Sequence, residues 1–159
     1  MSKPAFVYVI YIQTTPERIW DALRNPEATK GYWGWHRNVS DWKTGSPWRH
    51  EDYDDASLVH IQGEVVESDP PRRLVLTWSS PENAAKPDKV SRVTFDIEPF
   101  MGEVKLTVTH DDLDEDMLRG IAQGWPAILS SLKTLLETGS AMPMTQKRWA
   151  GKAATEARA

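Results

Sequence analysis

The chain has 159 residues, enough for one domain with its own hydrophobic core, and its 40% apolar and 26% charged residues are ordinary for a globular protein. The formal net charge of −4 argues against a general nucleic-acid binder, which needs a basic face to displace counterions from phosphates. Cysteine is absent, which excludes disulfides, thiolate zinc sites and cysteine nucleophiles.

The N-terminal segment carries no clear targeting signal. The longest apolar run, residues 5–12, is too short to cross a bilayer. It is also unlike a signal peptide, because it holds two tyrosines and is followed by polar residues where a small-residue cleavage site belongs. We therefore expect a cytoplasmic protein without membrane insertion.

The first elements are predicted to be one strand and two short helices. Residues 5–12 favour a strand, and Thr15 then supplies a hydroxyl N-cap with Pro16 at the first helical position. The same start signal recurs at Asn25-Pro26-Glu27, so a second short helix should end near Gly31.

The middle of the chain is predicted to be a series of antiparallel strands. Residues 31–49 contain four tryptophans, and Trp48 should begin a strand that turns at Asp54-Asp55 and returns over residues 58–66. A second hairpin follows, because the two prolines of Asp69-Pro70-Pro71 cannot continue either strand.

Two further strands with alternating polarity complete this series. Residues 81–88, with prolines and small side chains, indicate a mobile loop. Residues 90–98 then alternate apolar and polar side chains, and residues 104–110 do the same after a turn at Pro99-Phe100-Met101-Gly102.

A long amphipathic helix is predicted to follow. Apolar residues recur at spacings of three and four over residues 118–136, and Gly139 suits the helix C-cap. Pro126 cannot donate a helical hydrogen bond, so we expect either a kink there or a short helix over residues 114–123 and a new start near Gly124.

The last residues differ in composition from the rest. Residues 140–159 are small, polar and mildly basic, which predicts a loose C-terminal tail after a single domain over residues 1–139. Trp149 is the one residue in this tail that we expect to be able to dock.

This order of elements predicts an α+β fold of the helix-grip type. Six to seven antiparallel strands would form a curved sheet, with two short helices after the first strand. The last helix is the only element long enough to fill the concave side of such a sheet. The sheet would therefore wrap around the C-terminal helix.

Four segments of the sequence are informative together: residues 12–23, 63–78 and 93–110, and Gly124-Trp125 with Leu132. They resemble the family of activator of heat-shock-protein-90 ATPase homologues, within the superfamily of START lipid-transfer and birch-pollen-allergen domains (SRPBCC). The resemblance covers about residues 5–138 and implies a helix grip with an internal cavity, which superfamily members use for lipids, hormones and polyketides. Two departures are Pro126 inside the last helix and Gly45-Ser46 in place of a double glycine.

The candidate ligand-binding residues are mostly aromatic. A curved sheet and a helix leave space between them, typically ~300–1,000 Å³ for a small-ligand pocket. The same large side chains would also serve to fill that space, since each buries ~150–250 Å², and the sequence favours neither outcome. The aromatic candidates are Trp33, Trp35, Trp78, Phe95 and Trp125.

His110 is the candidate polar residue of this cavity. Alternation over residues 104–110 places it on the face that meets the helix, where it would bind a ligand carbonyl or act as a general base. The alternative is a histidine at a strand end, satisfied by a backbone carbonyl or by water. The pattern directs His60 toward solvent, and we expect His36 and His50 to be exposed.

We expect no metal site and no cofactor. The four histidines include no i,i+4 pair, and the acidic run over residues 111–116 lacks the central glycine of a calcium loop. That run is better explained as a solvated loop whose carboxylates favour the following helix N-terminus. The sequence also lacks a nucleophile elbow, a phosphate loop and a dinucleotide fingerprint.

Three functions are consistent with these observations. The first is binding of a small hydrophobic or aromatic ligand. The second is a cavity-based enzyme of the cyclase, dehydratase or hydrolase kind, which would need a second polar group beside His110; we assign no catalytic residue. The third, implied by the resemblance, is a chaperone partner that docks through residues 111–116. An open sheet also leaves edges through which a homodimer would form.

Overall fold

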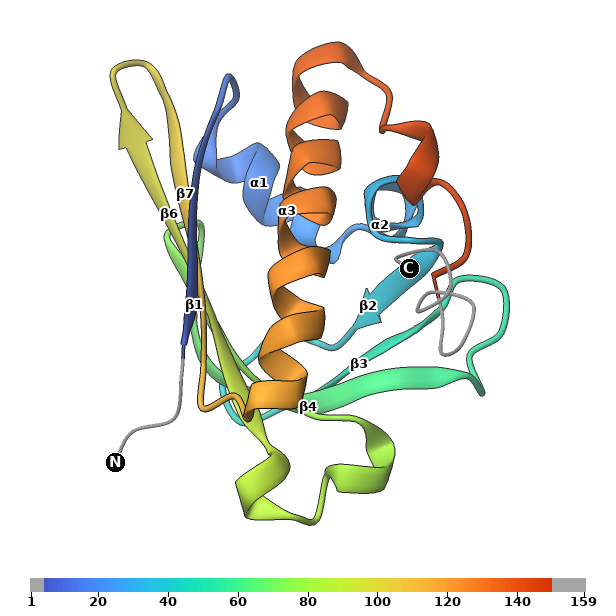
Figure 1. The fold of residues 1–159 in the computed structure, drawn as a ribbon. Helices are drawn as coiled ribbons and strands as arrows, with labels where there is room; N and C mark the ends of the chain where they lie inside the picture. Colours follow the sequence, from blue (N-terminus) through green and yellow to red (C-terminus); the bar gives the residue numbers. More distant parts are fainter. Residues whose placement is uncertain (1–4, 150–159) are drawn as a thin grey trace.

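A computed structural model describes residues 5–149 of the chain (Figure 1). Its elements in chain order are β1 (Phe6–Ile12), α1 (Pro16–Arg24), α2 (Pro26–Tyr32), β2 (His36–Val39), β3 (Pro47–Asp52), β4 (Val59–Asp69), β5 (Arg73–Trp78), η1 (Pro81–Asn83), η2 (Pro87–Lys89), β6 (Ser91–Phe100), β7 (Glu103–Asp111), α3 (Glu115–Thr138) and η3 (Pro143–Thr145).

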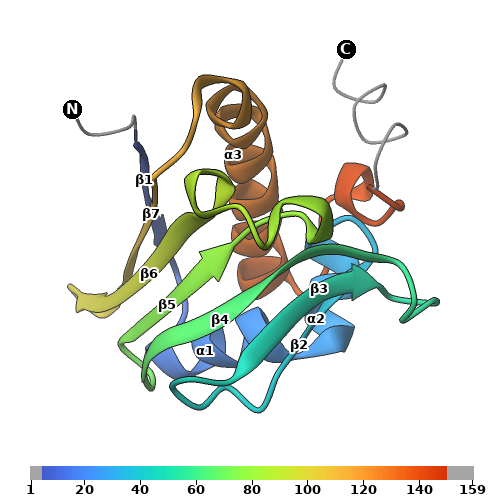
Figure 2. The same cartoon turned by 90° about the horizontal axis from the view of Figure 1, so that it is seen from below.

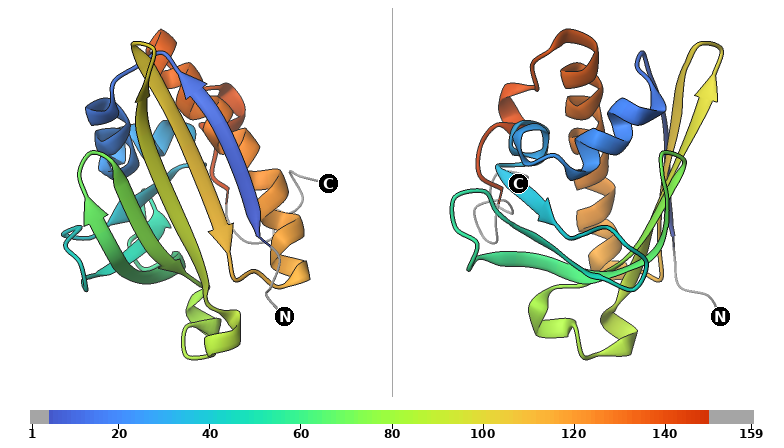
Figure 3. Two further views of the ribbon diagram at one scale, coloured as in Figure 1. Left: turned by 90° about the vertical axis from the view of Figure 1, so that its left-hand side faces the viewer. Right: turned by 180° about the vertical axis from the view of Figure 1, so that it is seen from behind.

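The strands form one antiparallel sheet in the order β1-β7-β6-β5-β4-β3-β2. The sheet curls, so that β1, β7 and β6 stand beside α3 while β3 and β4 pass across its N-terminal end (Figures 1 and 2). Figure 3 shows α3 against the concave side, with α1 and α2 near its C-terminal half. The predicted α+β helix grip is therefore confirmed. Strand β2, inside the tryptophan-rich segment, was not predicted.

Both short helices begin at the residues that the sequence indicates. The side chain of Thr15 accepts a hydrogen bond from the backbone N–H of Arg18 at 3.2 Å, and Asn25 accepts one from Glu27 at 3.0 Å. Each cap satisfies an amide that has no partner within its helix. This pairing explains why two such short helices form in succession.

Gly63 allows two strands to approach more closely than any other residue would permit. A Cβ atom at this position would lie 2.0 Å from the carbonyl oxygen of Thr77. The same oxygen accepts a hydrogen bond from the indole N–H of Trp48 at 2.8 Å, which ties β3 to β5 across β4. The register of β4 shifts shortly afterwards, between Val65 and Glu67, where the sheet bends.

Helix α3 differs from its prediction at one point. It runs unbroken through Pro126, so of the two expected alternatives the separate start near Gly124 is wrong. One missing hydrogen bond is outweighed because the helix buries a row of side chains from Trp125 onward. Its ends follow the sequence: Asp114 caps the first turn, and Gly139 ends the helix with φ of 94°. Within residues 5–149, no helix is long and apolar enough to span a membrane.

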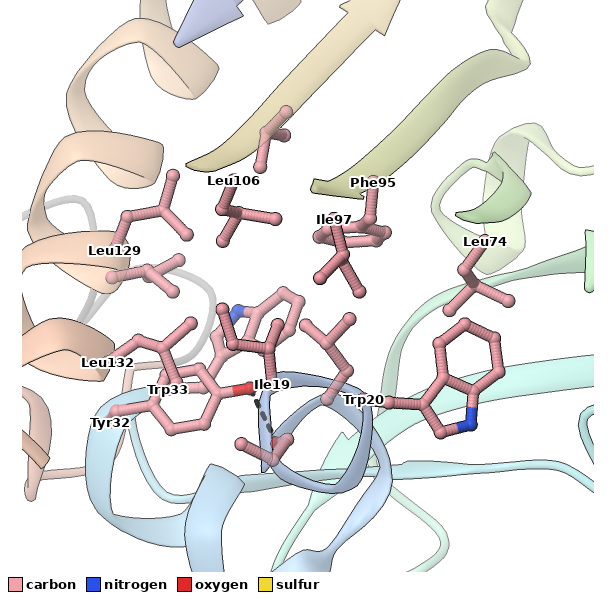
Figure 4. Close-up of a cluster of buried hydrophobic side chains, with 14 of the residues drawn as sticks. Ile19, Trp20, Tyr32, Trp33, Leu74, Phe95, Ile97, Leu106, Leu129 and Leu132 are labelled. Atoms are coloured by element: carbon pink, nitrogen blue, oxygen red, sulfur yellow. Dashed lines mark hydrogen bonds between the residues drawn. The ribbon is translucent and has the colours of Figure 1, made fainter. Parts of the chain in front are cut away.

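The main core lies between the C-terminal half of α3, the sheet and the two short helices (Figure 4). Leu129 and Leu132 of α3 face strand residues that include Leu106. The phenol of Tyr32, fully buried, donates a 2.7 Å hydrogen bond to the carbonyl of Ala22 and so fixes α2 against α1. This end of the grip is filled.

A methyl group at Gly63 should destabilise the fold. We expect Gly63→Ala to lower the free energy of unfolding by about 2–3 kcal/mol, because the Cβ would meet a backbone carbonyl that cannot move aside. Gly124→Ala is the matched control: its Cβ meets nothing within 4 Å, and alanine favours a helix by up to about 1 kcal/mol. Urea denaturation of both variants checks the difference; equal stabilities would contradict it.

Candidate functional site

A pocket of about 570 Å³ lies beneath the N-terminal half of α3. Its walls come from α3, from the start of β4, from η1 and from β2 and β3, and η1 and η2 lie below the first turns of the helix in Figure 1. None of the residues that α3 buries precedes Trp125, so this half of the helix is held away from the sheet. The residues that give the pocket its chemistry are Trp33, Trp78, Trp125, His36, His50 and His60.

Three indoles form one continuous wall of this pocket. The ring of Trp33 lies 6.3 Å from that of Trp78 and 5.4 Å from that of Trp125, and the latter two are 5.6 Å apart. Each is buried, with 2–7% of its surface exposed, so these rings complete the core and also line the space beside it. The sequence left open whether the aromatic side chains fill the core or line a pocket, and these three indoles do both.

Two of the predicted site residues lie outside the pocket lining. Phe95 is fully buried and packs edge-on behind Trp125 at 5.8 Å, where it fills core rather than lining space. Trp35 points elsewhere: its indole N–H donates to the Asp54 carboxylate at 2.7 Å, and its ring meets Tyr53 edge-on. The glycine-rich turn at residue 34 directs neighbouring tryptophans in different directions, which composition could not show.

His110 also lies behind the wall rather than in it. It is fully buried, as alternation along β7 predicts, and its Nδ1 accepts a 3.1 Å hydrogen bond from the indole N–H of Trp125. Its Nε2 lies 2.8 Å from the hydroxyl of Ser91, which in turn donates to the carbonyl of Trp78 at 3.0 Å. Both nitrogens are thus used, and a chain of hydrogen bonds joins α3 to the sheet.

This arrangement of hydrogen bonds excludes a catalytic serine–histidine dyad at Ser91 and His110. A histidine that removes a proton from serine needs an unprotonated nitrogen facing the hydroxyl. Here the indole N–H faces Nδ1 of His110, so the proton must sit on Nε2, and the imidazole donates to Ser91. Burial also lowers the pKa of His110 to about 3, so the ring is neutral at physiological pH. The residue positions Trp125.

The other histidines were misplaced by sequence reasoning. His36 and His50 are buried rather than exposed, because the unpredicted strand β2 pairs with β3 and turns both rings inward. Burial lowers the pKa of His36 to about 4 and lowers that of His50 well below its usual range. His60 is half-buried and lines the pocket. The sequence signal that could have located one of them is the spacing of two between Trp48 and His50, which places both on the same face of strand β3.

The histidines do not form a metal centre. His36 and His50 stack with an interplanar angle of 14°, so their ring nitrogens do not converge on one point. Across residues 5–149, no group of three or more histidine and acidic side chains is arranged to hold a metal ion.

The segment after α3 borders the pocket and is held at several points as far as residue 149. Thr145 is fully buried and contacts the hydroxyl of Ser131 at 2.6 Å, and the guanidinium of Arg148 binds the buried carboxylate of Asp52 at 2.9 Å. Trp149 docks beside the pocket, as its sequence suggested. The expectation of a loose tail therefore does not fit residues 140–149; residues 150–159 lie outside the described part.

The sequence profile of the activator of Hsp90 ATPase homolog 1-like proteins matches residues 13–137. The chain belongs to this family. The curled sheet and the long C-terminal helix place it in the START/SRPBCC superfamily. No curated protein sequence matches the chain significantly.

Solved structures of related proteins share this fold. ChR145 from Cytophaga hutchinsonii is 26% identical with a TM-score of 0.69, covering 87% of this chain and 97% of its own. The Aha1 dimer from Colwellia psychrerythraea is 20% identical with a TM-score of 0.68, covering 86% and 98%. DynU16, from the dynemicin biosynthetic locus, is 18% identical with a TM-score of 0.66, covering 86% of this chain and 48% of its own.

The buried histidines predict a fold that weakens in mild acid. In the unfolded chain each histidine takes up a proton near pH 6.5, whereas burial keeps His36, His50 and His110 neutral to much lower pH. Their contribution is therefore complete above pH 6.5 and is lost as the pH falls toward 4. Urea unfolding at pH 7 and pH 5 should show a loss of about 2 kcal/mol for each histidine.

A His110→Asn variant provides the control for this prediction. It should be less stable at every pH and should also lose about a third of the pH dependence between 7 and 5. Carboxylates with lowered pKa values, such as those of Glu27 and Glu137, titrate below this window and do not interfere. An unchanged slope in the variant would show that His110 does not contribute.

Proposed function

We propose that this protein binds a small apolar or aromatic ligand in the pocket between the sheet and α3. The observation that carries the proposal is a pocket of about 570 Å³ with a wall of three packed indoles. This volume is typical of small-ligand sites, which are mostly apolar with few polar groups. We propose Trp33, Trp78 and Trp125 as the ligand contacts, with Phe95 and His110 holding Trp125 from behind.

Two further observations support this proposal. The indole wall is rigid, because Trp125 is fixed by the hydrogen bond to His110 and by the ring of Phe95, and a preformed site loses less entropy when a ligand binds. Among proteins of the same fold, DynU16 belongs to a biosynthetic locus. A binding domain for small molecules would suit such a setting.

Filling the pocket should abolish binding without unfolding the protein. Gly124 lines the pocket, and its Cβ position is open, so Gly124→Phe should place a ring where the ligand lies. We expect at least tenfold weaker binding in this variant than in Gly124→Ala, measured by tryptophan fluorescence against lipids, flavonoids and aromatic polyketides. Trp35→Phe is a second control and should leave binding unchanged, since Trp35 faces Asp54 and Tyr53.

Two outcomes of this titration would contradict the proposal. Equal affinity in Gly124→Phe and Gly124→Ala would place the ligand elsewhere on the protein. The absence of any response from the wild-type protein to all three ligand classes would count against a binding function.

Membership of the family favours a second candidate, a chaperone partner. Its test is the ATPase rate of a bacterial heat-shock-protein-90 chaperone with and without the protein. The acidic residues between β7 and α3 are the candidate docking face, and Asp112→Asn with Glu115→Gln would remove charge there without touching the pocket. A stimulated rate that these substitutions abolish would support this function; an unchanged rate would reject it.

A further inference from the structure

The pocket wall contains a polar cluster that an apolar ligand alone does not explain. The rings of His36 and His50 stack with centroids 4.5 Å apart, and His60 meets His36 edge-on at 4.9 Å. The cluster adjoins the indole wall, since the ring of His50 lies 5.0 Å from that of Trp33 and 6.4 Å from that of Trp78. A ligand stacked on these indoles therefore lies next to the imidazoles.

Hydrogen bonds determine which nitrogen carries the proton in two of these rings. The amide of Asn38 donates to the carbonyl of Leu23 at 2.9 Å, which turns its oxygen toward Nδ1 of His50 at 2.7 Å. An amide oxygen only accepts, so Nδ1 of His50 donates and Nε2 remains an acceptor. In His36, Nδ1 lies 3.3 Å from the carbonyl oxygen of Trp33, which likewise leaves Nε2 as the acceptor.

Two ring nitrogens of the cluster, one of them the acceptor Nε2 of His36, have no hydrogen-bond partner within residues 5–149. Nε2 of His36 and Nε2 of His60 are buried without a hydrogen-bond partner among residues 5–149. A buried polar atom without a partner reduces stability, and a donor group arriving in the pocket would restore the missing bond. A ligand carbonyl or carboxylate would only accept, so it would not satisfy the acceptor nitrogens.

The charges around the pocket favour a neutral ligand. The acidic residues of the lining, Glu82 and Asp116, are exposed at its rim, and Asp116 already pairs with Arg119. The basic one, Lys89, binds the carboxylate of Asp114 at 3.0 Å. A buried cation or anion would therefore find no opposite charge beside the indoles.

We propose that the cluster of His36, His50 and His60 binds the hydroxyl group of a neutral hydroxylated aromatic ligand. The aromatic ring lies against the indole wall, and the hydroxyl donates to an imidazole nitrogen. This inference rests on the proposed function, because it assigns a ligand class to the same pocket.

The test compares 2-naphthol with naphthalene, which differ only in the hydroxyl. Both are titrated into the full-length ¹⁵N-labelled protein at pH 7.5, and affinities are taken from backbone amide shifts. We expect 2-naphthol to bind about tenfold more tightly, the change that one hydrogen bond in a pocket provides. Imidazole ¹⁵N signals of the cluster should shift with 2-naphthol and not with naphthalene.

Variants locate the effect. His36→Phe keeps a ring and removes the unpaired acceptor, so the tenfold preference should fall to about one while naphthalene affinity is retained. Because this change also removes the hydrogen bond from His36 to the carbonyl of Trp33, His60→Phe at the half-buried position provides a second variant. The imidazole spectra of the wild-type protein test the assignment without any substitution. Gly124→Phe should weaken binding of both compounds and so confirm the pocket as their site.

Each result discriminates between the two proposals. Equal affinities in the wild-type protein, or unchanged imidazole signals, would overturn the hydroxyl assignment and leave the binding function intact. Failure of both compounds to bind would overturn the assignment and also count against the proposed function.

Discussion

The hydrogen-bonded chain from Trp125 through His110 and Ser91 to the carbonyl of Trp78 fixes the helix against the sheet. Both nitrogens of the fully buried His110 imidazole are paired, and one of the partners belongs to α3. The helix therefore has one favourable position. From Trp125 onward the C-terminal half of α3 packs against the core. Before Trp125 the N-terminal half of the helix buries no residue and stands away from the sheet. The pocket follows from that difference.

Local signals were sufficient to predict most of the fold. Helix caps at Thr15 and Asn25, the prolines of the 69–71 turn and the alternation over residues 90–110 depend on neighbouring residues alone, and each has its predicted outcome. The predictions that failed concern elements whose structure depends on contacts between residues far apart in the sequence. Pro126 stays in the helix because the buried side chains that follow it hold the helix in place. Strand β2 exists because β3 supplies its hydrogen bonds.

The site was less predictable than the fold, for a related reason. Alternation gives the face of a strand residue, so the inward direction of His110 follows from the sequence. It does not give the neighbours, so neither Ser91 nor the indole of Trp125 could be named as its partners. Trp33 and Trp35 are alike in sequence, yet positive φ at Gly34 and Trp35 separates them, and only Trp33 reaches the pocket.

The buried histidines differ in whether both of their ring nitrogens are hydrogen-bonded. His110 uses both nitrogens to connect the helix with the sheet, so the fold itself accounts for an imidazole there. His36 has an unpaired Nε2, which reduces stability relative to an apolar ring of similar size. Its Nδ1 binds the carbonyl of Trp33, but no contact within residues 5–149 accounts for the acceptor at Nε2. An acceptor that the fold leaves unpaired, beside a pocket with an indole wall, is the feature on which the proposed hydroxyl contact rests.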